Sequence, residues 1–204
     1  MLFLRGCARY SQCYHVKQMI FFRRCIAVNT ITKEETAIQL RDERVVQFRE
    51  PTADDGKEMF RIVKESEVLD VNSSYSYLMW SKYFNKTSIV ASCEDEVIGF
   101  VSGFLFPDSP DTLFVWQVAV DPKFRGHGLA TKLIDQLIQQ LDKIDEVNYL
   151  EATVTPSNIP SSKLFQGLAK KNNTECTVFE CFSEDQFPDP DHEAELTYRV
   201  GPFK

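Results

Sequence analysis

Long apolar runs are missing from this sequence of 204 residues. No stretch approaches the roughly 18 to 20 apolar residues that a membrane-spanning helix needs, so we expect no membrane partner. Basic residues are in the minority, because 23 Lys and Arg stand against 30 Asp and Glu. The resulting net charge of −7 argues against a general nucleic-acid binder, which would neutralise phosphates with cationic side chains.

Recognisable metal motifs are also missing, although the chain has six cysteines. They are Cys7, Cys13, Cys25, Cys93, Cys176 and Cys181. The last three lack partners at the spacing of zinc ligands. The first three could form a cluster with His15, but their separations are irregular. We therefore expect no metal, and reduced thiols in a cytoplasmic protein.

Acidic residues are absent from the first 33 positions, which hold six Lys or Arg, whereas the rest of the chain has 17 bases and 30 acids. This segment lacks an apolar stretch followed by a small-residue cleavage site, which disfavours a secretory signal. An organellar transit peptide remains an alternative. We expect residues 1–44 to be a basic N-terminal extension that is disordered or non-native. Residues 45–204 then form one domain.

Residues 45–204 show the patterns of a mixed α/β domain on a single sheet. The periodicities predict strands at 44–49, 88–93, 97–106, 112–120, 149–155, 177–182 and 195–200. They predict helices at 52–64, 128–142 and 161–171. Residues 67–85 are expected to be irregular, because they are too polar for a core and too aromatic for a linker. This order of elements is typical of the α/β class.

A glycine-rich turn, Arg125-Gly126-His127-Gly128-Leu129-Ala130, joins a predicted buried strand to a long predicted helix. Such a turn exposes backbone N–H groups at a helix N-terminus, which suits a pyrophosphate. It is not a dinucleotide fingerprint, because Thr131 replaces the third glycine, and it lacks the Gly-Lys-Ser/Thr ending of a P-loop. By itself, the turn is equally compatible with a tightly packed helix entry.

The longer segment Val118-Ala119-Val120-Asp121-Pro122-Lys123-Phe124-Arg125-Gly126-His127-Gly128-Leu129-Ala130 resembles the acetyl-CoA motif of the GNAT N-acetyltransferase superfamily. Asn158, followed three residues later by Ser161, matches a second element of that superfamily. The resemblance implies a GNAT fold over residues 45–204. This is a mixed, mostly antiparallel central sheet flanked by helices. Its fourth and fifth strands splay into a V that holds the pantetheine of acetyl-CoA.

The resemblance also implies roles for individual residues. The backbone of Val118 and Val120 would bind pantetheine, and the Val118 N–H would polarise the thioester carbonyl. The remaining cofactor contacts would come from Arg125, Gly126, His127, Gly128, Leu129, Ala130, Thr131, Asn158 and Ser161. Phe165 is a departure, because many members carry there a Tyr that protonates the leaving thiolate. A thiolate with a pKa near ~8.5 can leave without full protonation, so the proton donor is unassigned.

Three further blocks, 70–78 (DVNSSYSYL), 110–120 (PDTLFVWQVAV) and 149–158 (YLEATVTPSN), narrow the resemblance. They are similar to the L-2,4-diaminobutyrate acetyltransferases of ectoine biosynthesis. This family transfers acetyl from acetyl-CoA to the γ-amine and makes N4-acetyl-L-2,4-diaminobutyrate, an intermediate towards a compatible solute. The resemblance implies a cytoplasmic homodimer with diaminobutyrate as its small-molecule substrate.

Diaminobutyrate carries two ammonium groups and one carboxylate, and only a free amine attacks a thioester. Asp70 suits an ammonium group. Trp116, expected on the same strand face as Phe114 and Val118, offers its π-face to a cation. The substrate-binding candidates are Asp70, Asn72, Ser74, Tyr75, Trp116, Thr153, His192 and Glu195.

Glu151 is the first candidate for the general base, because its predicted strand borders the expected splay. With Trp116 and Val118 it makes up the expected catalytic set. Glu195 and His192 are the alternatives, directly or through a water molecule. The acidic loop 183–193 would attract a dicationic substrate.

Two other functions stay open on the sequence alone. One is a GNAT acetyltransferase for another small amine or for a protein N-terminus. The polar block 70–77 disfavours the protein substrate, because it suits a closed cup better than an open peptide groove. The other is a non-catalytic CoA-binding protein, suggested only by Phe165.

Overall fold

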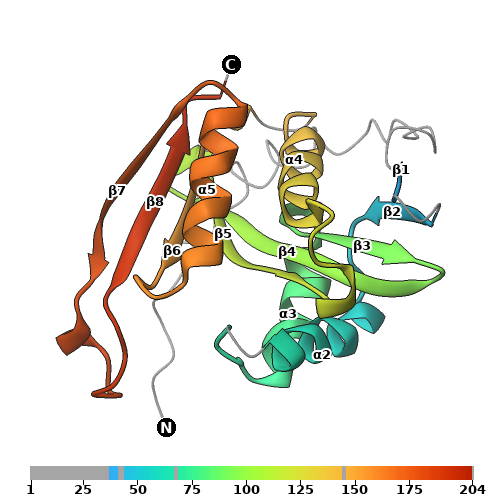
Figure 1. Ribbon diagram of the computed structural model, residues 1–204, viewed down its shortest axis with the longest axis horizontal. Helices are drawn as coiled ribbons and strands as arrows, with labels where there is room; N and C mark the ends of the chain where they lie inside the picture. The colour runs from blue at the N-terminus through green and yellow to red at the C-terminus, as the bar shows by residue number, and fades with distance from the viewer. Residues whose placement is uncertain (1–36, 41–43, 67–68, 144–145, 204) are drawn as a thin grey trace, which may run out of the picture. The chain divides into compact units, whose positions relative to one another are not determined.

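A computed structural model describes residues 37–40, 44–66, 69–143 and 146–203. Eight strands form one sheet (Figure 1). The strands are β1 Ala37–Gln39, β2 Val45–Arg49, β3 Ile89–Cys93, β4 Glu96–Phe106, β5 Ser109–Val120, β6 Tyr149–Val154, β7 Glu175–Phe182 and β8 Glu195–Gly201. The helices are α2 Gly56–Ser66, α3 Ser74–Tyr83, α4 Leu129–Leu141 and α5 Ile159–Lys171. None of the helices in these ranges is both long and apolar enough to cross a bilayer.

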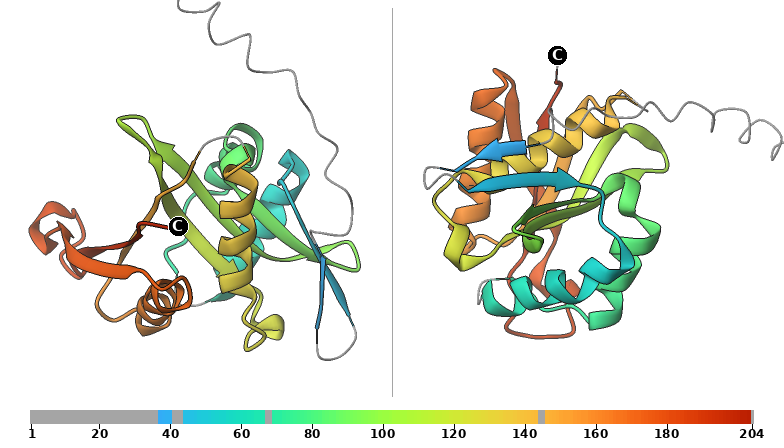
Figure 2. Two further views of the ribbon diagram at one scale, coloured as in Figure 1. Left: turned by 90° about the horizontal axis from the view of Figure 1, so that it is seen from above. Right: turned by 90° about the vertical axis from the view of Figure 1, so that its right-hand side faces the viewer.

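The two faces of the sheet are covered by different helix pairs (Figure 2). Leu133, Ile134 and Leu137 of α4 join Leu168 of α5 in the larger core. A smaller core gathers Met59, Ile62 and Val63 of α2 against β3 and β4. The apolar residues of α2 and α4 recur at helical spacing, which is why the sequence predicts both helices.

The sheet splits where its only parallel pair of described strands lies. The order is β1-β2-β3-β4-β5-β6-β8-β7, and β5 is parallel to β6. Pairing is confined to Thr112–Phe114 against Tyr149–Glu151, although β5 continues to Val120 and β6 to Val154. The predicted mixed, mostly antiparallel sheet with a V-shaped splay is therefore confirmed. The strands predicted as the fourth and fifth are β5 and β6 in the structure, because the additional strand β1 precedes the first predicted strand.

A β-bulge in β5 lies at the mouth of this splay. Ser102 of β4 pairs with Gln117, and the next residue, Gly103, pairs with Val115, so Trp116 is an extra residue in β5. A Cβ atom at Gly103 would lie 2.4 Å from the carbonyl oxygen of Phe114, which explains the need for glycine there. The inserted residue shifts the alternation of all side chains that follow it.

The bulge corrects one prediction about β5. Leu113 and Val115 before the bulge and Val118 after it all pack in the larger core. Phe114 and Trp116 lie instead beside Phe104 and α3. The prediction that Trp116 and Val118 share a strand face is therefore wrong, because strict alternation does not continue through a bulge.

Helix α3 corrects a second prediction, since residues 67–85 were expected to be irregular. The Ser73 hydroxyl caps the helix by accepting a hydrogen bond from the Ser76 N–H at 3.3 Å. Tyr77 is almost fully buried and meets Phe60 and Phe100 edge-on. Aromatic residues occupy both the buried and the exposed side of α3, so its sequence lacks the periodicity of an amphipathic helix.

The folded domain begins before Val45. β1 pairs with β2, and Leu40 is buried in the larger core. The expected boundary between residues 44 and 45 is thus too late, because a three-residue strand is too short for its pattern to be detected in the sequence. The other expectations for the N-terminal extension fall on residues 1–36, outside the described residues.

Candidate active site

A cavity of about 480 Å³ opens where β5 and β6 diverge. Its walls come from the end of β5, the N-terminal ends of α4 and α5, and the C-terminal end of α2. The structure brings together here ten of the eleven predicted cofactor residues: Val118, Val120, Arg125, Gly126, Gly128, Leu129, Ala130, Thr131, Asn158 and Ser161. His127 belongs to the same turn but does not line the cavity.

The glycine-rich turn is shaped to receive an anion. Gly126 and Gly128 have φ angles of +83° and +69°, which L-residues with a side chain rarely adopt. A Cβ atom at either position would meet nothing within 4 Å, so the space in front of the turn is open. Lys132 donates the hydrogen bond that closes the first turn of α4 on the Gly128 carbonyl. The N–H groups before Lys132 are therefore available to a phosphate.

A second helix begins at the same cavity. The Asn158 side chain caps α5 by accepting a hydrogen bond from the Ser161 N–H at 3.1 Å. Arg125 lies at the cavity rim, where its Nε donates to the Val120 carbonyl oxygen at 3.3 Å. Two helix N-termini and one guanidinium group thus surround this space, which favours a negatively charged ligand.

A polar cavity of about 680 Å³ adjoins the first, and Leu69 and Asn158 line both. Six of the eight predicted substrate residues line this second cavity: Asp70, Asn72, Trp116, Thr153, His192 and Glu195. Ser74 and Tyr75 do not line it, so the structure does not bring them together with the other six. Both lie in the first turn of α3, and Tyr75 lines a separate aromatic groove with Trp80. The sequence could not place them because α3 was not predicted.

Glu195, at the start of β8, has the environment of a proton acceptor. Its Oε2 atom is buried without a hydrogen-bond partner among the described residues. Burial raises the pKa of Glu195, and the negative charges of Asp70 and Glu193 act in the same direction. Thr153 and His192 oppose this shift. A carboxylate with an open oxygen and a raised pKa beside a cavity is suited to general base catalysis.

Glu151 has a different environment from the one expected. Its carboxylate forms an ion pair with Arg199, its register partner on β8, and Arg199 also lies 3.9 Å above the Tyr149 ring. Glu151 lies at the closed end of the splay, opposite Phe114, and lines neither of the two cavities. The structure therefore favours Glu195 over Glu151 as the base.

The acidic loop 183–193 forms one rim of the polar cavity. Glu193 accepts hydrogen bonds from the Ser157 N–H at 3.1 Å and from the Ser157 hydroxyl. His192 stacks on Phe187 with ring centroids 3.7 Å apart, and its Nδ1 lies 2.6 Å from the Glu193 carbonyl oxygen. The loop is thus fastened to the turn that begins α5. Neither Ser157 nor Glu193 was predicted as a site residue.

Gln117 is a further site residue that the sequence reasoning missed. Its Nε2 donates to the Asp70 carbonyl oxygen at 2.9 Å and holds the 69–72 segment over the cavity. The Tyr77 hydroxyl lies near Gln117 and Asn72, and burial raises the pKa of Tyr77. A lone amide within the otherwise apolar run 113–120 was the available signal for Gln117.

Phe165 is a core residue. It is 2% exposed, and its ring lies 6.2 Å from that of Tyr198. The Tyr198 hydroxyl donates to Ser162 at 2.9 Å. Within the described ranges, no group of three or more His, Cys, Asp or Glu side chains is placed to hold a metal ion.

Comparison with known proteins identifies this architecture. The model of the acetyltransferase (GNAT) family matches residues 55–169, which is more than half of the chain. The chain belongs to the GNAT acetyltransferase family, and the predicted GNAT fold is confirmed.

Individual relatives narrow the assignment. An L-2,4-diaminobutyric acid acetyltransferase of Marinococcus halophilus is 53% identical over 76% of this chain and 90% of its own length. The corresponding enzyme of Halalkalibacterium halodurans is 52% identical over 75% of this chain and 80% of its own length. The solved diaminobutyrate acetyltransferase EctA of Paenibacillus lautus, in complex with L-2,4-diaminobutyric acid and coenzyme A, is 38% identical. Its TM-score is 0.73, over 78% of this chain and 96% of that one. Within the GNAT family, this chain belongs to the L-2,4-diaminobutyric acid acetyltransferases.

Proposed function

We propose that this chain is a cytoplasmic enzyme that transfers acetyl from acetyl-CoA to the γ-amine of L-2,4-diaminobutyrate, the step that yields N4-acetyl-L-2,4-diaminobutyrate in ectoine biosynthesis. One observation carries the proposal: an anion-binding cavity and a carboxylate-lined cavity meet at the splay of the sheet. The relative from Paenibacillus lautus, solved with both ligands, supports it. The free thiols of Cys176 and Cys181 suit the reducing cytoplasm.

The cofactor residues act mainly through their backbone. Acetyl-CoA supplies the acetyl group as an activated thioester. The first turn of α4 binds its pyrophosphate through N–H groups, with Arg125 and the N-terminal end of α5 beside it. Val118 and Val120 bind the pantetheine arm, and the Val118 N–H donates to the acetyl carbonyl oxygen. The fit is consistent with the open space in front of Gly126 and Gly128.

The substrate residues supply charge and a proton acceptor. Asp70 pairs with the α-ammonium group, while Asn72 and Thr153 orient the amino-acid end. Trp116 forms the wall between the polar cavity and the aromatic groove. Glu195 accepts a proton from the γ-ammonium group, directly or through a water molecule, and frees the lone pair that acyl transfer requires.

A panel of amines tests the proposed substrate. We expect kcat/KM for L-2,4-diaminobutyrate to exceed that for ornithine, lysine, 1,3-diaminopropane or a peptide N-terminus by at least about tenfold, because a buried polar site rejects analogues that leave its groups unpaired. The measurement is release of free CoA thiol at steady state. Equal efficiency with another amine would contradict the substrate assignment. Binding of acetyl-CoA without turnover of any amine would instead favour a non-catalytic role.

We also propose that the enzyme is a homodimer. The outer strand β7 leaves Val178, Phe179 and Phe182 about half exposed, which is unusual for large apolar side chains on a sheet edge. We expect light scattering to give twice the monomer mass for the wild type and a monomer for Phe179→Glu. Gln139→Glu, which adds the same charge on the exposed side of α4, is the control. A monomeric wild type would contradict the proposal.

A further inference from the structure

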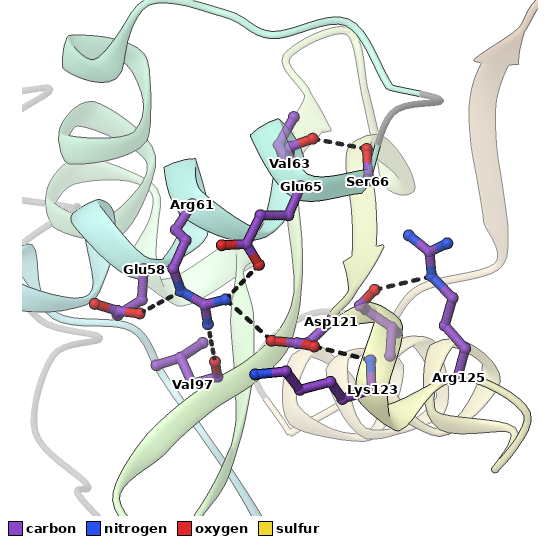
Figure 3. Close-up of polar contacts among 10 residues, drawn as sticks. Glu58, Arg61, Val63, Glu65, Ser66, Val97, Asp121, Lys123 and Arg125 are labelled. Atoms are coloured by element: carbon purple, nitrogen blue, oxygen red, sulfur yellow. Dashed lines mark hydrogen bonds and ion pairs between the residues drawn. The ribbon is translucent and has the colours of Figure 1, made fainter.

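Arg61 of α2 connects three carboxylates (Figure 3). Its Nε donates to Glu58 at 2.8 Å, and its Nη1 lies 2.8 Å from Glu65. Both of these partners are on the same helix. The third is Asp121, at 3.0 Å from Nη1, which lies sixty residues away and directly follows β5. Arg61 therefore fastens α2 to the exit of β5.

Asp121 uses both carboxylate oxygens, and it is only 4% exposed. Oδ2 accepts from Arg61, whereas Oδ1 accepts the Lys123 N–H at 2.9 Å. The second bond caps the 3-10 turn Pro122–Phe124, which leads directly into the glycine-rich turn. A buried carboxylate needs such partners, because an unpaired charge away from water is strongly unfavourable.

The two elements that this ion pair joins are opposite walls of the cofactor cavity. Ser66 at the C-terminal end of α2 and Leu69 just beyond it line one wall. Phe124 and the glycine-rich turn line the other, and Phe124 is anchored in the larger core. Arg61 and Asp121 line neither cavity, so they do not contact the ligands directly.

We propose that Arg61 is a positioning residue for acetyl-CoA, acting through Asp121 to hold the end of α2 and the glycine-rich turn at the separation that the cofactor requires. This inference rests on the proposed function of the cofactor cavity. The polar cavity is held by other contacts: Gln117 of β5 donates to the carbonyl oxygen of Asp70, and Glu193 and Glu195 belong to the C-terminal part of the chain. Loss of the Arg61–Asp121 pair should therefore affect the cofactor and spare the amine.

Two variants test the ion pair from its two ends. Arg61→Ala removes the guanidinium group, and Asp121→Asn removes the charge while keeping an oxygen that can cap Lys123. We expect each to weaken CoA binding and to raise the KM for acetyl-CoA about tenfold, the effect of losing a hydrogen bond between charged groups. The KM for diaminobutyrate should change less than about twofold. Calorimetry with CoA alone gives the dissociation constant without turnover.

Glu58→Gln and Glu65→Gln are the matched controls, because each removes a charged partner of the same guanidinium that lies on α2 itself and does not join α2 to β5. We expect both to bind CoA like the wild type. The double variant Arg61→Ala/Asp121→Asn should bind CoA no more weakly than either single variant, since both remove one interaction.

Several results would overturn the positioning role. One is an Arg61→Ala variant whose CoA dissociation constant equals that of the wild type. This outcome includes a variant in which fewer molecules bind CoA but those that do bind it with wild-type affinity. Another is a Glu65→Gln variant that loses as much affinity as Arg61→Ala. A third is an equal rise in both KM values. A wild-type chain that does not bind CoA would overturn the proposed function as well, which separates the two failures.

Discussion

Replacing Glu195 with Gln is expected to lower kcat about 10²- to 10⁴-fold at neutral pH, the range that general base catalysis contributes. The carboxamide keeps the shape of the side chain but cannot accept a proton. Because burial raises the pKa of Glu195, the wild-type kcat/KM should fall as the pH drops through a value above that of an ordinary glutamate. The variant should lose less at high pH, where more of the γ-amine is already deprotonated.

A pH profile of the Glu151→Gln variant is the control. Glu151 is ion-paired with Arg199 outside both cavities, so this variant should keep the wild-type profile. The opposite outcome, a large loss in Glu151→Gln and a small one in Glu195→Gln, would return the role of base to Glu151.

Measuring the folding stability of the Glu195→Gln variant distinguishes a loss of catalysis from a loss of structure. A raised pKa in the folded state means that folding favours the protonated carboxyl. The stability associated with Glu195 is therefore present below its unfolded pKa and is lost as the pH rises through its folded pKa. At neutral pH the ionised side chain destabilises the folded state, and the neutral Gln removes this cost. The melting temperature of Glu195→Gln should equal or exceed that of the wild type, even though its activity is lost.

Substituting Gly128 with Val is expected to weaken CoA binding at least about a hundredfold, because two effects combine. The φ angle of +69° is strained for a β-branched residue. The new side chain would also occupy the open space in front of the turn, where the pyrophosphate would lie. Calorimetry with CoA measures the loss directly.

Gly167→Ala is the matched control for this substitution. Gly167 also has open space around its Cα, but it lies within α5, has an ordinary φ and does not line the cofactor cavity. CoA affinity should stay at the wild-type value, and helix propensity should add about 0.5–1 kcal/mol of stability. A Gly128→Val variant with wild-type affinity would show that the pyrophosphate binds elsewhere.

The parts of this fold that the sequence predicts are those with local patterns. The hairpin of β3 and β4, the amphipathic α2 and α4, and the glycine-rich turn can each be recognised in one short, continuous stretch of sequence. The bulge at Trp116 has no such signal, because it depends on how β5 pairs with β4. Helix α3 was missed because its stability comes from burial of Tyr77 among aromatic rings of other elements.

In the candidate site, too, the part with a local sequence pattern is predicted and the part assembled from distant segments is not. The cofactor side is one continuous turn with a helix on either side of the splay, so a short motif predicts nearly all of it. The substrate side is assembled from β5, β6, β8 and an acidic loop. Glu151 and Glu195 look alike in the sequence. They are distinguished only by the ion pair that Glu151 forms with Arg199, forty-eight residues away. Glu195 has no such partner among the described residues and stays the candidate base.

The extra residue in β5 has a consequence for how such an enzyme can diversify. Trp116 and Gln117 line the cavity proposed for the acceptor amine, whereas the next residue, Val118, lines the cavity proposed for the acetyl donor. Selection can therefore act on neighbouring codons for separate purposes. A lineage that changes Trp116 or Gln117 can acquire new amines while its use of the donor is preserved, so acceptor preference can drift without loss of the shared chemistry.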